Sequence, residues 1–127
     1  MSRTMAFVTA LVISSAAAAC TGNGGLNGAV QPVSGAASLR VSNNSQLALD
    51  MYVRSGGVTQ RLGTVSPGLD GTFVLQPEML RDGPVELFAQ PIGGGRIVRS
   101  GALAVSPGGI VEFYIGHSVI DSHVTVR

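Results

Sequence analysis

Two distant stretches of the chain alternate hydrophobic and other residues with a period of two. Residues 47–54 place Leu, Leu, Met and Val at every second position, and residues 85–90 place Val, Leu and Ala in the same way. A period of two is typical of a β-strand that buries one face. The pattern therefore predicts strands packed on one side against a core.

Clusters of Gly, Pro, Ser and Asp separate the apolar stretches and predict turns between strands. The expected strands cover residues 38–43, 47–54, 58–65, 71–76, 84–91, 96–105, 110–116 and 119–126. One short helical turn is expected at residues 77–80. No window of a dozen residues has a helical period, so long helices are not expected.

The sequence also contains a short internal repeat, which we call the echo. Val-Ser-Pro-Gly occurs at residues 65–68 and again at 105–108, each time between two expected strands. The echo predicts a duplicated three-strand unit, with one sheet formed largely from each copy. Together with a first and a last strand, this gives a small, all-β, antiparallel β-sandwich of about seven to eight short strands.

The spacing of Arg40-Val41, residues 49–53 and Gly56-Gly57 resembles that of small β-sandwich modules on bacterial envelope proteins. These modules are immunoglobulin-like or transthyretin-like, and many have no assigned activity. The resemblance implies a fold rather than a function.

The first 19 residues have the character of an export signal. Arg3 is their one charge, and residues 6–19 form an uncharged, mostly apolar run that ends in small residues. A helix of 14 residues spans about 21 Å, which is shorter than the hydrocarbon core of a bilayer. A cleaved signal is therefore favoured over a permanent membrane span.

The single cysteine, Cys20, follows directly after three alanines, with Ala17 at the third position before it. This arrangement resembles the lipobox of bacterial lipoprotein precursors, in which Leu is preferred at that third position. The resemblance implies a diacylglyceryl group on the Cys20 thiol, cleavage before it and acylation of the new N-terminus. Thr21, in place of Asp, favours the outer membrane. An ordinary cleaved signal that leaves Cys20 as a free thiol remains the alternative.

Residues 21–37 are rich in Gly, Asn, Ser and Ala and carry no charge, which predicts a flexible tether with a mean reach of roughly 20–25 Å. The expected organisation is a signal peptide at 1–19, a lipidated Cys20 and linker at 20–37, and a β-sandwich domain at 38–127. Such a chain is expected in the cell envelope, lipid-anchored and facing the periplasm or the surface.

Charge and composition exclude some partners. Eight basic residues oppose seven acidic ones, and charged residues make up only 12% of the chain. A net charge of +1 does not attract nucleic acid. The expected partners are the membrane, through the lipid on Cys20, and an unidentified envelope protein or a second copy of the chain.

The best candidate for chemistry is the group His117, Asp121 and His123 near the C-terminus. Imidazole nitrogens and a carboxylate suit Zn²⁺ or Cu²⁺. In a strand over 119–126, Asp121 and His123 share a face. The alternative is a solvated strand face, with Val119, Ile120, Val124 and Val126 at buried positions.

No catalytic or cofactor-binding motif stands out. A Gly-x-Ser-x-Gly sequence between a strand and a helix is absent. The aromatic residues Tyr52, Phe88 and Tyr114 lie out of register with the core positions, which indicates either a binding face or partial cover on both sheet faces. The hypothesis is a non-enzymatic envelope lipoprotein that acts as a structural or protein-interaction module. The alternative is a periplasmic small-ligand or metal-binding protein that uses the His117–His123 end.

Overall fold

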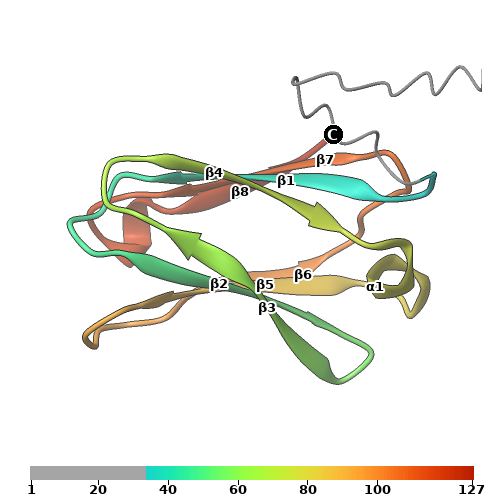
Figure 1. The fold of residues 1–127 in the computed structure, drawn as a ribbon, viewed down its shortest axis with the longest axis horizontal. Helices are drawn as coiled ribbons and strands as arrows, with labels where there is room; N and C mark the ends of the chain where they lie inside the picture. Colours follow the sequence, from blue (N-terminus) through green and yellow to red (C-terminus); the bar gives the residue numbers. More distant parts are fainter. Residues whose placement is uncertain (1–33) are drawn as a thin grey trace, which may run out of the picture.

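The structure, a computed structural model, describes residues 34–127, which form a two-layered β-sandwich (Figure 1). The elements are β1 (Ala37–Asn43), β2 (Leu49–Ser55), β3 (Val58–Val65), β4 (Asp70–Leu75), α1 (Pro77–Arg81), β5 (Val85–Pro91), β6 (Val98–Leu103), β7 (Ile110–Ile115), the 3-10 turn η1 (Val119–Asp121) and β8 (His123–Val126). The expectation of a small all-β sandwich with about eight short strands is confirmed.

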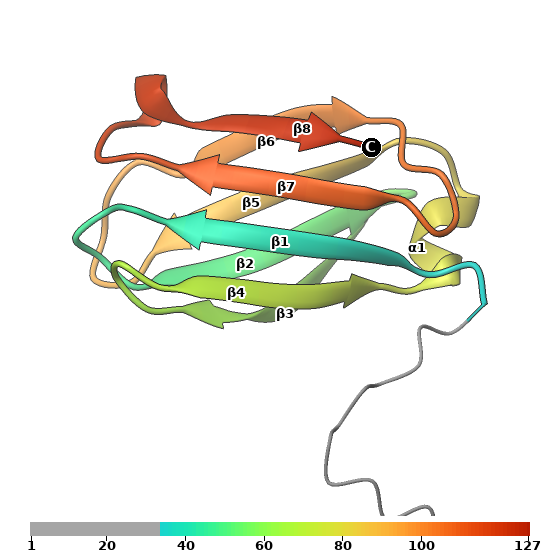
Figure 2. The ribbon, with the colours of Figure 1, turned by 90° about the horizontal axis from the view of Figure 1, so that it is seen from above.

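Each layer is a four-stranded sheet. Sheet A has the order β4-β1-β7-β8, and sheet B has the order β3-β2-β5-β6. Figure 2 shows sheet A lying over sheet B, with β4 above the β3 edge and β8 above the β6 edge. All neighbouring strands are antiparallel except β1 and β7, which run parallel. The alternation of hydrophobic and polar residues did not predict that parallel pair, because it contains no information on strand direction.

The first seven strands were predicted well, with ends that differ by at most two residues. The helical turn after β4 was also correct, and Pro77 occupies its first turn, where its missing N–H costs no hydrogen bond.

The predicted strand over 119–126 was wrong in its first half. Residues 119–121 form η1, and Ser118 caps its N-terminus, because the Ser118 side chain accepts a hydrogen bond from the Ile120 backbone N–H. Ile120 was expected in the core but is 92% exposed, and Val126 is also exposed. The local cap therefore overrides the β preference of Val119 and Ile120.

The duplicated unit occurs as predicted in its strand order but not in its placement. Each copy forms a hairpin in sheet B, β2-β3 or β5-β6, and then sends its third strand, β4 or β7, into sheet A. The expectation of one sheet largely from each copy was therefore wrong. The echoed Val-Ser-Pro-Gly sequences are the crossovers that redirect the chain between sheets.

Both crossover turns have the same geometry. Leu69 N–H donates to Ser66 O at 3.2 Å, and Gly109 N–H donates to Ser106 O at 2.9 Å. Proline in the second position and a glycine at positive φ in the third suit a type II turn, and Gly68 and Gly108 have φ values of 69° and 78°. The repeated tetrapeptide is thus a repeated turn.

Each crossover turn is hydrogen-bonded to one end of β1. Gly68 N–H donates to Asn43 O at 2.8 Å, and Gly108 N–H donates to Ala36 O at 2.8 Å. β4 and β7 are consequently held on either side of β1. Ala36 and Ala37 are themselves buried, so the folded domain begins before residue 38.

The core between the sheets is apolar apart from one side chain, Asn43 at the end of β1. Its Nδ2 donates to the carbonyls of Leu47, Val65 and Ser66 at 2.8–3.1 Å. Its Oδ1 accepts from the backbone N–H and the hydroxyl of Ser45. Asn43 thereby joins β1, the loop after it and the first crossover.

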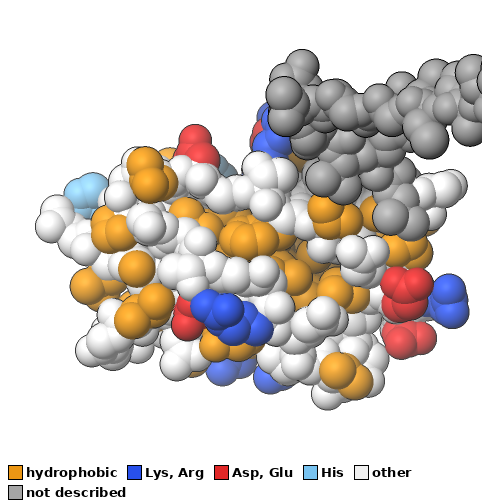
Figure 3. All heavy atoms as spheres, in the orientation of Figure 1, with side chains coloured by type: hydrophobic (Ala, Val, Ile, Leu, Met, Phe, Trp, Pro, Cys, Tyr) orange, Lys and Arg blue, Asp and Glu red, His pale blue; other side chains and the backbone are white. Residues whose placement is uncertain are grey.

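Phe73 closes the side of the sandwich where β3 and β4 lie. A Cβ placed on Gly63 would come within 2.7 Å of the Phe73 ring, and a Cβ on Gly71 would come within 2.7 Å of Val65 Cγ2. Figure 3 shows hydrophobic side chains gathered between the two sheets in this view. The two glycines therefore leave room for the Phe73 ring at the β3–β4 edge of the sandwich.

We expect Asn43→Ala to lower the free energy of unfolding by about 2–4 kcal/mol, because three carbonyls lose a donor at a buried site. Asn43→Asp should be worse, since a carboxylate would face the same three oxygens. Urea unfolding measures both, with exposed Asn44→Ala as the matched control, expected to change stability by less than about 0.5 kcal/mol. An Asn43→Ala variant as stable as Asn44→Ala would contradict this role.

We expect Gly71→Ala to destabilise the domain by about 1–3 kcal/mol through overpacking, because a Cβ there would come within 2.7 Å of Val65 Cγ2. The Gly71 backbone is not in the left-handed region, so backbone strain does not add to this penalty. The clash is with Val65, so the penalty should shrink in a Val65→Ala background. A double-mutant cycle by urea unfolding measures this coupling. Equal penalties in both backgrounds would show that the Val65 contact is not the cause.

Candidate functional site

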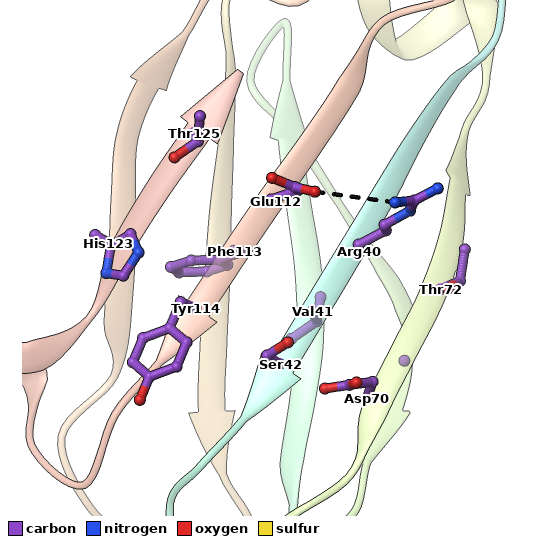
Figure 4. A pocket seen from close by; sticks show the side chains of 11 residues that line it. Arg40, Val41, Ser42, Asp70, Thr72, Glu112, Phe113, Tyr114, His123 and Thr125 are labelled. Carbon is purple, nitrogen blue, oxygen red and sulfur yellow. Dashed lines mark ion pairs between the residues drawn. The ribbon is translucent and has the colours of Figure 1, made fainter. Parts of the chain in front are cut away.

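The outer face of sheet A carries two rows of polar side chains that cross all four strands. Strand alternation turns Leu39, Val41 and Asn43 of β1 inward, so Arg40 and Ser42 point outward. The registers of the four strands then place the outward residues side by side (Figure 4). The first row is Asp70, Ser42, Tyr114 and His123, and the second row is Thr72, Arg40, Glu112 and Thr125.

The two rows line a shallow hollow of about 390 Å³, which we call the sheet A hollow. Its aromatic part is formed by Tyr114 of β7 and His123 of β8. Their rings stack with centroids 4.9 Å apart and planes at 23°. Tyr114 is 37% exposed, so the imidazole supports the phenol ring from one side while the ring stays open to solvent.

The charged part of the sheet A hollow is centred on Glu112. Arg40 Nη1 lies 3.9 Å from Glu112 Oε1, and Arg127 Nη2 lies 2.9 Å from Glu112 Oε2. These pairs are exposed and contribute little to stability. They leave the Glu112 carboxylate of the second row paired with two guanidinium groups.

Most polar groups of the sheet A hollow make no side-chain hydrogen bond within residues 34–127. This is true of Ser42, Asp70, Thr72, Tyr114, His123 and Thr125. Hydroxyls both donate and accept, and a carboxylate accepts. The face therefore presents donors and acceptors that a ligand would be able to use.

The outer face of sheet B differs, because many of its polar groups interact with one another, although Tyr52 and Gln90 line a hollow of about 260 Å³ there. Phe88 points away from the core but is only 6% exposed. The guanidinium carbons of Arg54 and Arg99 lie 4.7 and 5.2 Å from its ring centroid. Arg54 also pairs with Glu86 at 3.7 Å and donates from Nε to the Thr59 hydroxyl.

A second group of polar side chains that bond to one another lies on the outer face of sheet B. Asp50 Oδ1 accepts from the Thr64 hydroxyl at 2.6 Å and from Arg61 Nη2 at 2.7 Å. The hydrogen bond from Thr64 and then that from Arg61 hold the pKa of the Asp50 carboxyl below its usual value. Of the aromatic residues singled out in the sequence, Tyr114 is exposed, whereas Phe88 is covered by arginines.

The fold does not bring the candidate metal ligands His117, Asp121 and His123 together. His117 lines a hollow at the end of the sandwich with Arg96 and Leu47, whereas His123 lines the sheet A hollow. Asp121 lies in η1 rather than in β8, so it shares no strand face with His123. Within residues 34–127, no three His, Cys, Asp or Glu side chains come together as a metal site.

Cys20, the expected lipidation site, lies outside the described residues, as do the expected signal peptide and most of the linker. In the part of the chain from residue 34 onward, no helix has the length and apolar character needed to cross a membrane.

The sequence did not identify Asp70, Ser42 and Thr72 as members of one site. Ser42 and Thr72 lie in strands that were predicted, whereas Asp70 lay outside the strand predicted at 71–76, and the rows depend on β1 pairing with β4 and β7 at once. That order is set by contacts far apart in the chain. The one usable signal was the Ser-Pro-Gly echo, which marks where β4 and β7 begin.

The Asn43-Asn44-Ser45 sequence, which matches an N-glycosylation acceptor, proves to be structural. The Asn43 side chain is buried, with 1% of the residue exposed, and its amide nitrogen already donates to three carbonyls. The motif therefore stabilises a loop in the folded domain.

No family model matches the chain, and no curated protein matches it. Among solved structures, it is similar to the NMR structure of a protein from Eubacterium rectale, with 11% identity, a TM-score of 0.49, and coverage of 73% of this chain and 89% of that one. It is also similar to the crystal structure of a Gram-negative toxin, with 11% identity, a TM-score of 0.42 and coverage of 74% of this chain but only 23% of the toxin. Likenesses this low in identity and TM-score carry no information about function.

Proposed function

We propose that the protein is a non-enzymatic, envelope-anchored lipoprotein whose β-sandwich serves as an interaction module. The observation that carries the proposal is the sheet A hollow, where polar groups on four strands keep their hydrogen-bonding capacity, while most of those on sheet B interact among themselves. Donors and acceptors that stay open on a surface are able to pair with those of a partner in the envelope.

The position of the hollow is compatible with an anchor at Cys20. The chain enters β1 at Ala37, and Ser42 lies five residues further along the same strand, or about 17 Å at the rise of a β-strand. A tether that enters at Ala37 would therefore join the domain at one end of sheet A and leave the first polar row accessible.

The test of anchoring is the intact mass of the mature N-terminal peptide from the membrane fraction of a bacterial host. We expect it to begin at Cys20 and to carry the added mass of a diacylglyceryl group and a fatty acyl chain. Cys20→Ala should remain uncleaved or leave the membrane fraction, whereas the matched Thr21→Ser variant should be modified normally. A mature chain with an unmodified Cys20 thiol, or one that begins elsewhere, would refute the anchor.

The alternative function is metal or small-ligand binding by the end that contains His117, Asp121 and His123. Because the two histidines line different hollows, we expect Zn²⁺, Cu²⁺ and EDTA each to change the melting temperature by less than about 1 °C. A metal-dependent increase that His117→Ala abolishes would favour the alternative over the interaction module.

A further inference from the structure

We propose that the sheet A hollow binds a neutral glycan, a short chain of pyranose rings, as the ligand of the interaction module. This inference rests on the proposed function and specifies the chemistry of its partner. Three properties of the hollow carry it, namely its mixed hydrogen-bonding groups, its supported aromatic ring and its balanced charge.

The hydrogen-bonding groups match a polyhydroxylated ligand. Ser42, Thr72 and Thr125 offer hydroxyls that donate and accept, Asp70 offers a carboxylate that accepts, and Arg40 offers N–H donors. Each sugar hydroxyl is likewise both donor and acceptor, so it is able to pair with either kind of group. A ligand that lacked hydroxyls would leave these groups without partners and lose affinity.

The aromatic ring supplies the apolar contact that sugars require. A pyranose ring has a face of C–H groups, and this face packs against aromatic side chains. Tyr114 is the exposed aromatic residue in the hollow, and stacking on His123 limits its freedom to move. A ring held in place loses little conformational entropy when a ligand packs on it.

The charge of the face favours a neutral ligand. In the lining of the hollow, the Arg40 guanidinium stands against the carboxylates of Glu112 and Asp70, and Arg127, which is next to the lining, pairs with Glu112 and balances the second negative charge. A balanced face attracts neither phosphate polymers nor acidic peptides over a distance. A protein partner, for its part, would favour an apolar centre with few charges, whereas here charged and hydroxyl groups occupy the centre.

The extent of the rows favours an oligosaccharide over a single sugar. The row from Asp70 to His123 crosses four strands, and three steps of about 4.8 Å give roughly 14 Å. A parallel row from Thr72 to Thr125 lies two residues away along the strands. A chain of several rings is needed to contact both ends of such a surface.

The experiment is a titration of the purified full chain, in detergent, with cellotetraose, maltotetraose and chitotetraose, each to about 10 mM. Calorimetry measures affinity, and amide NMR spectra locate the site. We expect at least one of the three to bind, with the largest shifts at residues 40–42, 70–72, 112–114 and 123–125. Tyr114→Ala should weaken this binding by about tenfold or more.

The matched control is Tyr52→Ala, which removes the outward tyrosine of sheet B and should leave affinity unchanged within about twofold. Tyr114→Phe keeps the ring and should retain most of the binding. Asp70→Ala, at an exposed position, should weaken binding several-fold, so the proposal remains testable if Tyr114→Ala does not fold.

Several outcomes would overturn the proposal. These are no binding of any of the three glycans, binding that Tyr114→Ala and Asp70→Ala leave unchanged, and amide shifts confined to sheet B. Binding of a tetra-alanine peptide at the same face in place of the glycans would assign the hollow to a protein partner. Because the titration does not depend on the lipid, its failure and a failure of anchoring at Cys20 are distinguishable.

Discussion

The backbone of the first strand is the constraint on which the rest of the sandwich depends. Both crossovers between the sheets are hydrogen-bonded at the ends of β1, the first to Asn43 O and the second to the carbonyl of Ala36, the residue just before the strand. β4 and β7 leave these turns already aligned along either side of β1, one antiparallel and one parallel. Without that strand the two repeated units would have hairpins in sheet B but no common partner in sheet A.

The two outer faces of the sandwich have opposite character, although both arise from the same strand alternation. On sheet B, Arg54 and Arg99 cover Phe88, and Asp50 is bonded to Arg61 and Thr64. On sheet A, polar groups stand side by side across the strands and leave their hydrogen-bonding capacity open. The two faces therefore differ in how many of their polar side chains are paired within the domain.

Asn43 shows how one polar residue organises an apolar core. An unpaired amide at a position with 1% exposure would cost stability. Here both the donor and the acceptor atom of the amide are paired, with Nδ2 donating to three carbonyls and Oδ1 accepting from Ser45. The same bonds fix the loop after β1 and the start of the first crossover. They therefore support the alignment of β1 with β4, on which the two polar rows depend.

The sequence alone determined the two-layered all-β class, the approximate bounds of the first seven strands and the outward position of Tyr114, because these follow from local alternation and turn chemistry. It also marked the crossovers through the Ser-Pro-Gly echo. The strand predicted over 119–126 was wrong in its first half, because the Ser118 side chain caps η1 there and this hydrogen bond overrides the β propensity of Val119 and Ile120. Strand order, the parallel pair and the meeting of Asp70 with Ser42 were decided by tertiary structure. Pairing between strands depends on contacts distant in sequence, which periodicity within one strand does not record.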